Sequence, residues 1–85
     1  MKQLEVLEGL KGFISEEILD GKDIGLDAST PLLEWGIINS MEIARIVSFV
    51  YDRFNIEIPS DKITLEYLKD LNSLTNLVMD LATDG

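Results

Sequence analysis

Ser40 is the residue of this chain whose type and setting most clearly suggest chemistry. It follows the turn-forming residues 36–39 (Gly-Ile-Ile-Asn) and stands where a strongly apolar helical pattern begins. A hydroxyl at a helix N-terminus lies near unpaired backbone N–H groups and the positive end of the helix dipole, which favour an anion. A catalytic serine needs an adjacent base, and the chain has no histidine or cysteine. We therefore interpret Ser40 as a point of attachment and not as a catalytic nucleophile.

The residue types give little support for a metal site, a phosphate-binding loop, a ligand pocket or an enzyme active site. Carboxylates are the only strong metal ligands available, and their spacing does not match a calcium loop, so pairs such as Glu16 and Glu17 are expected to be solvated surface. No glycine-rich phosphate loop follows a strand pattern. Trp35 lies in an apolar loop and could line a ligand pocket, but packing over the edge of the core is the commoner role. No acid–base pair can be assembled, so the sequence does not predict an enzyme.

Length and charge set the class of protein. With 85 residues and 46% hydrophobic content, the chain is expected to be a single domain over residues 1–85. The net charge of −9 argues against nucleic-acid binding, and it is uneven: residues 1–39 hold eight acids and three bases, whereas residues 40–54 hold two of each. The acidity indicates solubility or steering toward basic partner surfaces. Neither a signal peptide nor a membrane span is evident, so a cytoplasmic protein is the expectation. We also expect the chain to be a monomer.

Helical periodicity predicts a first helix over residues 3–19. Its apolar stripe is expected to consist of Leu4, Leu7, Leu10, Ile14 and Ile18, flanked by Val6 and Phe13. Gly21 is a candidate for the position just after the helix. Residues 20–39 then form an unusually long loop, whose many apolar residues predict that it lies on the core. Within it, Thr30 and Pro31 predict a short helical turn capped by Thr30.

Residues 40–54 predict a second helix with Asn39 or Ser40 as its N-cap. Its inward stripe is expected to be Ile43, Ile46, Val47, Val50 and Phe54, and its other faces carry Met41, Ala44, Arg45, Ser48 and Tyr51. Pro59 keeps the connector 56–59 extended.

Two further helical segments follow the connector. Residues 64–69 predict a short helix capped by Thr64, and Asn72 or Ser73 is expected to cap a final helix that continues through Leu81. Residues 83–85 are expected to fray. The predicted fold is therefore an all-α bundle of three longer helices and one short helix, with a long loop between the first two helices.

The sequence around Ser40 resembles the carrier-protein family, the acyl and peptidyl carrier proteins that bear a 4′-phosphopantetheine arm. The resemblance rests on residues 36–41 (Gly-Ile-Ile-Asn-Ser-Met) in place of the family's Gly-x-x-Asp-Ser-Leu. It also rests on Ile58-Pro59 after the second helix and on length, acidity and helix order along essentially the whole chain. It implies that Ser40 carries the arm, that a phosphopantetheinyl transferase attaches it, and that the arm presents a thioester-bound intermediate to docked enzymes.

Two departures from the family pattern concern docking. Asn39 replaces the usual aspartate and removes its charge, so the resemblance does not imply recognition by every phosphopantetheinyl transferase. Arg45 stands where many fatty-acid carriers have an acidic residue, so the acidic docking stripe is weakened. Partner contacts are therefore expected to be more apolar. The candidate docking residues are Asn39, Met41, Ala44, Arg45 and, on the third helix, Tyr67.

One subgroup of the carrier-protein family resembles this sequence more closely than the family as a whole does. Residues 30–41 (TPLLEWGIINSM), 63–64 and 67–72 are similar to stand-alone peptidyl carriers that hold L-proline while a flavin dehydrogenase oxidises it toward a pyrrole or pyrroline. This similarity implies an aminoacyl cargo, a proline-activating adenylation enzyme and a flavin-dependent acyl or prolyl dehydrogenase as partners. A stand-alone acyl carrier or a D-alanyl carrier is the alternative within the family. An unmodified helical interaction module is the alternative outside it.

Overall fold

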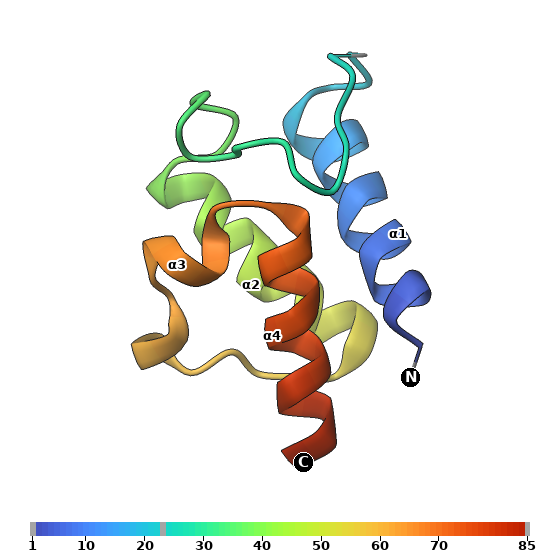
Figure 1. The fold of residues 1–85 in the computed structure, drawn as a ribbon, viewed down its shortest axis with the longest axis vertical. Coiled ribbons are helices and arrows are strands. Elements are labelled where there is room, and N and C mark those ends of the chain that lie inside the picture. The colour runs from blue at the N-terminus through green and yellow to red at the C-terminus, as the bar shows by residue number, and fades with distance from the viewer. Residues whose placement is uncertain (1, 23, 85) are drawn as a thin grey trace.

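The computed structural model describes residues 2–22 and 24–84, without the side chains of residues 83 and 84. This part of the chain is helical and has no strand (Figure 1). The helices are α1 (Gln3–Phe13), α2 (Ser40–Phe54), α3 (Leu65–Leu68) and α4 (Leu71–Asp84), with a π-helical turn (Ile14–Ile18) directly after α1 and a 3₁₀ turn (Ser60–Lys62) before α3. The predicted fold of three longer helices, one short helix and a long first loop is confirmed.

The first helical run covers the predicted residues but ends in a wider turn. The Leu19 N–H donates to the carbonyl of Ile14, five residues earlier, and the Gly21 N–H donates to that of Ser15, both at 2.8 Å. The C-cap of the run is Leu19, and the left-handed residue directly after it is Asp20 (φ +56°), followed by Gly21 (φ +79°), so the helix stop is one residue earlier than predicted. The predicted stripe is wrong at Leu4, which is 66% exposed. Leu4 lies about 120° around the helix from buried Leu10, at 3.6 residues per turn.

The long loop lies on the core, as its apolar content predicts. Leu32 and Ile38 are buried in it. Two backbone hydrogen bonds join it to the α3–α4 junction, from the Leu32 N–H to the Lys69 carbonyl at 2.8 Å and from the Asn72 N–H to the Ala28 carbonyl at 3.0 Å. The loop is therefore held in place by backbone contacts as well as by its apolar side chains.

Two predictions about the loop are wrong. Trp35 does not pack over the core edge but is 61% exposed, because Leu32 and Ile38 take the buried positions and the turn between them carries Trp35 outward. Thr30 does not cap the turn that follows Pro31, although that turn forms. Its hydroxyl instead accepts a hydrogen bond from the Asp27 N–H at 2.9 Å and donates to the Asp27 carboxylate at 3.2 Å, which closes the preceding turn.

The second helix matches its predicted bounds. Ile46, Val50 and Phe54 are buried, and Ile43 and Val47 are partly buried against the core, so the inward stripe is confirmed. The helix ends at Asn55, which adopts the left-handed conformation with a φ of +58° and donates its N–H to the Tyr51 carbonyl.

The last helices begin differently from the prediction. Thr64 precedes α3, but its side chain makes no capping hydrogen bond. The carboxylate of Asp70 accepts from the Ser73 N–H at 2.8 Å, so Asp70 caps α4 and the predicted caps Asn72 and Ser73 lie inside its first turn. Asp70 fits because a side-chain oxygen before the first turn can reach the third helical N–H. The α4 backbone stays helical through residue 84, so the fraying predicted for residues 83 and 84 is not seen in the backbone, and residue 85 lies outside the described part of the chain.

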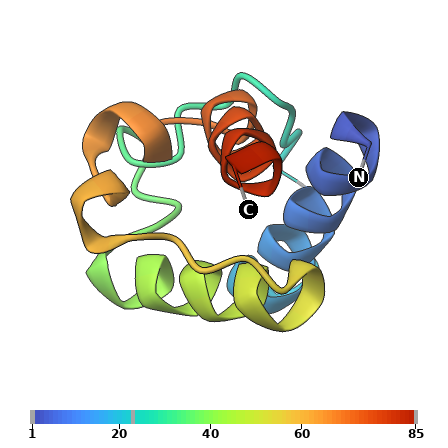
Figure 2. The same cartoon turned by 90° about the horizontal axis from the view of Figure 1, so that it is seen from below.

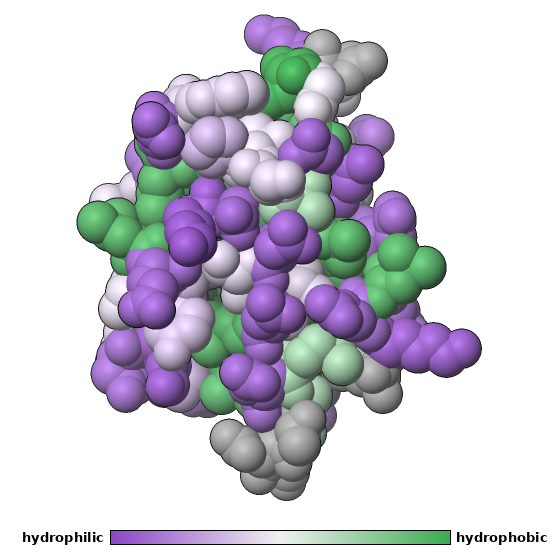
Figure 3. All heavy atoms as spheres, viewed as in Figure 1, coloured by the Kyte–Doolittle hydropathy of each residue, from purple (hydrophilic) through white to green (hydrophobic). Residues whose placement is uncertain are grey.

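The bundle encloses one core, with overall extents of 34 × 24 × 21 Å. Figure 2 looks nearly along α4 and shows the other three helices around it. Buried residues come from all four helices and both long connections. They are Val6, Leu10, Ile14, Leu32, Ile38, Ile46, Val50, Phe54, Ile58, Leu68, Leu71, Leu74, Leu77 and Val78. On the face that carries α3 and α4, polar side chains separate the apolar patches (Figure 3). In the described part of the chain, no helix is both long and apolar enough to cross a membrane.

Candidate functional site at the start of α2

Ser40 is the first residue of α2, and its side chain is exposed. Its position is set from both sides, because Ile38 is buried two residues before it and Ile43 is partly buried three residues after it. The neighbouring side chains of Asn39 and Met41 are also exposed, Met41 by 71%. The backbone is therefore fixed, while the hydroxyl is open to solvent.

Asn39 is the N-cap of α2. Its side-chain oxygen accepts hydrogen bonds from the N–H groups of Met41 at 2.9 Å and Glu42 at 3.3 Å, and the Glu42 carboxylate accepts from the Asn39 N–H at 3.2 Å. This is a capping box. An asparagine thus performs the capping role without a charge. Because Asn39 already occupies the N–H groups of residues 41 and 42, an anion on Ser40 gains the field of the helix dipole but not those two hydrogen bonds.

The Arg45 side chain makes contacts with the first helical run that the sequence does not predict. Its Nη2 donates to the backbone carbonyl of Glu17 at 3.2 Å and lies 3.9 Å from the Glu17 carboxylate. Its guanidinium also lies 5.9 Å from the centre of the Phe13 ring. The side chain is 45% exposed, so it bridges α2 to the end of the first helical run and remains accessible.

The remaining candidates come from two elements. Ala44 is exposed on α2 one turn after Ser40, so the structure brings Asn39, Met41, Ala44 and Arg45 together along the first turns of one helix. Tyr67 belongs to α3, is half-buried, and has the Lys62 ammonium 5.5 Å from its ring centre. Figures 1 and 2 both show α3 on the same side of the bundle as the first turns of α2.

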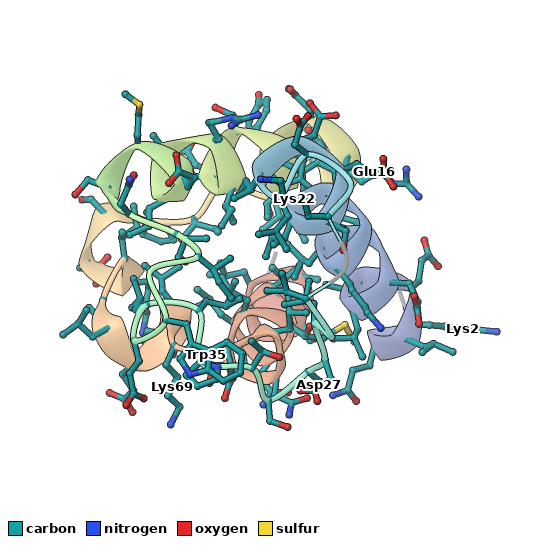
Figure 4. All side chains as sticks on the ribbon, turned by 90° about the horizontal axis from the view of Figure 1, so that it is seen from above. Lys2, Glu16, Lys22, Asp27, Trp35 and Lys69 are labelled. Atoms are coloured by element: carbon teal, nitrogen blue, oxygen red, sulfur yellow. The ribbon has the colours of Figure 1, made fainter. Side chains whose placement is uncertain are left out.

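Trp35 is not part of this cluster. Figure 4 shows it with Lys69 and Asp27 on the side of the molecule away from α2. Asp27 stabilises that part of the loop, since its carboxylate accepts from the Ser29 N–H at 2.8 Å and from the Thr30 hydroxyl. The Ser29 N–H, more than any other group, holds the pKa of Asp27 below its usual value.

Sequence reasoning missed two residues of the site. Glu42 completes the capping box, and the spacing Asn39-x-x-Glu42 is a signal that could have revealed it. Glu17 holds Arg45 through its backbone carbonyl. No spacing rule predicts that bond, because the two residues are 28 positions apart. Within the described residues, no three His, Cys, Asp or Glu side chains group as metal ligands.

The chain has a relative of similar length. It is 32% identical over 68 residues to a protein of Serratia sp. (strain ATCC 39006) described as probable acyl carrier protein PigG, over 80% of this chain and 78% of the relative. The chain belongs to the acyl carrier protein family. The carrier is therefore a non-catalytic protein whose family bears a covalently attached 4′-phosphopantetheine group. No family model matches the chain.

A solved structure has the same fold. One chain of a structure described as the crystal structure of FAD-dependent dehydrogenase superposes on the carrier with a TM-score of 0.78 and 30% identity. The match covers 82% of the carrier and 99% of that chain, so the matched chain is no longer than a carrier.

The residues at the start of α2 fit the group that the family carries. A bulky phosphodiester needs a hydroxyl with open space around it, and the exposed Ser40 hydroxyl lies between two exposed side chains. The positive end of the α2 dipole lies at the same place. When bound, the group supplies a terminal thiol on a flexible chain.

Proposed function

We propose that the carrier is a single domain over residues 1–85 that bears 4′-phosphopantetheine on Ser40 and holds an aminoacyl thioester, specifically L-prolyl, for partner enzymes of natural-product biosynthesis. The proposal that Ser40 is the attachment site rests on one observation. Ser40 is the exposed first residue of α2, on a backbone fixed by the Asn39–Glu42 capping box. The helix dipole favours a phosphodiester there by about 0.3–1 kcal/mol.

The proposed cargo rests on two further observations. Residues 30–41 and 67–72 are similar to peptidyl carriers that present proline to a flavin dehydrogenase. Independently, a carrier-sized chain with the same fold and 30% identity occurs in a structure described as an FAD-dependent dehydrogenase. Both observations favour a flavin-dependent dehydrogenase as the enzyme that acts on the cargo. An adenylation enzyme selects the amino acid, so specificity arises from docking and not from a pocket in the carrier.

The proposed docking surface follows the first turns of α2. Met41 is an exposed apolar residue beside the attachment point, which is a common setting for a binding hot spot. Asn39, Ala44 and Arg45 extend the contact along α2, and Tyr67 adds α3. The proposed partners are a phosphopantetheinyl transferase, a proline-activating adenylation enzyme and the dehydrogenase. The proposed setting is the cytoplasm, with the carrier acting as a monomer.

The cargo is tested by loading the modified carrier. The carrier bearing phosphopantetheine is incubated with ATP, the adenylation enzyme encoded nearest to it and a panel of amino acids, and each product is measured by intact mass. We expect a mass increase with L-proline and none with the other amino acids. Exclusive loading of another amino acid would contradict the prolyl cargo but not the carrier function.

A second candidate function is a stand-alone acyl carrier. The description of the Serratia relative as a probable acyl carrier protein favours it. The same mass measurement separates the two functions when an acyl-activating enzyme and fatty acids replace the adenylation enzyme and amino acids. Loading by the acyl-activating enzyme alone would establish the second function.

A further inference from the structure

A cleft of about 440 Å³ lies between α2 and the end of the first helical run. Figure 2 shows the end of that run lying against α2. Ala44 and Arg45 follow Ser40 by about one helical turn, so the cleft opens beside the proposed attachment point. Its walls include Phe13 and Glu17 from the first run and Ala44, Arg45 and Ser48 from α2. A side chain of a docked enzyme can therefore enter the cleft while that enzyme acts at the end of the arm.

The Arg45 guanidinium is held in one place in this cleft. Its Nη2 donates to the Glu17 carbonyl at 3.2 Å, and its carbon lies 5.9 Å from the centre of the Phe13 ring, within the range of a cation–π contact. The Phe13 ring is itself fixed by stacking on Phe49, with the ring centres 4.5 Å apart. The side chain has therefore lost rotamer freedom in the free carrier, and a group that binds it does not have to order it first.

Most of the hydrogen-bonding capacity of Arg45 remains open. A guanidinium presents several N–H donors in a planar fork, and its only hydrogen bond to a described residue is the one to the Glu17 carbonyl. The Glu17 carboxylate lies 3.9 Å away, beyond hydrogen-bond length, and the two side chains are 45% and 59% exposed, so this ion pair is weak. A carboxylate that accepts two parallel hydrogen bonds fits the open fork better.

The neighbouring carboxylates of the carrier do not fill this fork. Glu42, one turn before Arg45, uses its carboxylate in the capping box with Asn39. Asp52 follows Arg45 by seven residues, an axial distance of about 10.5 Å, which is about one Debye length in physiological salt. The net charge of −9 repels an acidic partner surface at longer range. An acidic side chain is therefore favoured only where it meets Arg45, so this contact determines specificity and not the rate of encounter.

We propose that Arg45, held by the Glu17 carbonyl and the Phe13 ring, is the receptor for an aspartate or glutamate side chain of the adenylation enzyme. This inference rests on the proposed docking surface and names what the partner presents there. The adenylation enzyme meets the carrier before any cargo is loaded, so protein contacts supply its specificity. Glu17 has two opposite effects, because its carbonyl places the guanidinium while its carboxylate competes with the incoming one.

Loading kinetics with matched charge variants test the receptor. The carrier bearing phosphopantetheine, confirmed by intact mass, is loaded by the adenylation enzyme encoded nearest to it, with ATP and the amino acid that the parent accepts. The measured quantity is kcat/KM for the carrier. Arg45→Glu is expected to lower it at least about tenfold, because two carboxylates then face each other. Arg53→Glu makes the same change of charge in the last turn of α2 and is expected to stay within about twofold.

Two milder variants separate recognition from support of the fold. Arg45→Lys keeps the charge but loses the planar fork, and is expected to lower kcat/KM about three- to tenfold. Glu17→Gln keeps the backbone carbonyl and removes the competing carboxylate, so it is expected to raise kcat/KM about two- to fivefold. Glu16→Gln removes the same charge from a residue that lines a different cleft, and a change of less than about twofold is expected. A bridge with a structural role alone would give no gain in Glu17→Gln.

The outcomes separate the receptor from the proposed function. Loading of Arg45→Glu at the parent rate and melting temperature would overturn the receptor, and so would an unchanged or lower kcat/KM in Glu17→Gln. If Arg45→Glu melts at a lower temperature, Arg45→Lys and Glu17→Gln decide.

Modification by a broad-specificity phosphopantetheinyl transferase serves as the control reaction. An equal loss of that reaction in Arg45→Glu would overturn the assignment to the adenylation enzyme. Loading of the parent with an amino acid other than proline would contradict the proposed cargo and leave the expectations for Arg45 unchanged, whereas no loading of the parent by this enzyme would overturn both.

Discussion

The segments before and after residue 39 differ in how they are held. Residues 27–38 are fixed by the Asp27–Thr30 turn, by buried Leu32 and Ile38, and by two backbone hydrogen bonds to the α3–α4 junction. The next residues, Asn39, Ser40 and Met41, have exposed side chains, and the side-chain hydrogen bonds there stay within the Asn39–Glu42 capping box of α2. The difference shows that the attachment point is positioned through the backbone that leads to it. The hydroxyl itself remains free to be modified and to meet partners.

The largest expected effect lies in the fixed segment. Leu32→Ala removes a fully buried side chain and is expected to lower the free energy of unfolding by about 2–5 kcal/mol, measured by urea denaturation. The matched control is Ile24→Ala in the same loop, where the side chain is 41% exposed, with an expected change within about 0.5 kcal/mol. Similar losses in both variants would show that the loop is not anchored at Leu32.

The junction between the two segments is expected to have an intermediate effect. Asn39→Ala removes the side-chain oxygen that caps α2 and is expected to cost about 1 kcal/mol of unfolding free energy. Asn39→Asp keeps a capping oxygen and is expected to retain nearly the stability of the parent protein. If Asn39→Ala melted at the parent temperature, the capping box would not stabilise the attachment point.

The Asp27 turn predicts a smaller, pH-dependent effect. The folded state lowers the pKa of Asp27 below 3.8, so its ionised form stabilises the fold above that pH, and the stabilisation is lost as the pH falls through the lowered pKa. Asp27→Asn is expected to be slightly less stable at neutral pH and to show a weaker loss of stability in acid. Melting temperatures at pH 7 and across pH 2–4 measure this difference. Parallel pH profiles for the two proteins would contradict it.

A substitution in the exposed segment is expected to affect partner enzymes but not the folding of the carrier. Met41→Asp changes a side chain that is 71% exposed, so the melting temperature is expected to stay nearly unchanged while loading by the adenylation enzyme slows. Tyr51→Asp, at an exposed position on the same helix, serves as the control and is expected to load normally. Loading of Met41→Asp at the parent rate would place the docking surface elsewhere.

Local patterns predicted the parts of the molecule that depend on local physics. The apolar spacing in residues 40–54 gave the bounds of α2, and Gly21 marked the end of the first helical run to within one residue, because both signals act over a few residues. The position of Ser40 at a helix start followed from the same pattern.

Features that depend on distant contacts could not be predicted in this way. The Arg45–Glu17 bond joins residues far apart in the sequence, and the outward direction of Trp35 depends on which loop residues reach the core first. The exposure of Leu4 was missed because the buried face of α1 is centred on Leu10, a phase set by the packing of α1 against α4. The start of α4 was missed because several capping residues stand close together, and only the folded chain shows that Asp70 makes the bond.

Intact mass after incubation with coenzyme A and a broad-specificity phosphopantetheinyl transferase shows whether Ser40 is the attachment point. We expect a gain of one phosphopantetheine in the parent protein and none in Ser40→Ala, with both proteins melting at nearly the same temperature because the Ser40 side chain is exposed. Ser48→Ala, also exposed on α2, is expected to gain the group like the parent. A mass gain that persists in Ser40→Ala, or that maps to Ser48 or Ser73, would contradict the assignment of Ser40 as the attachment point.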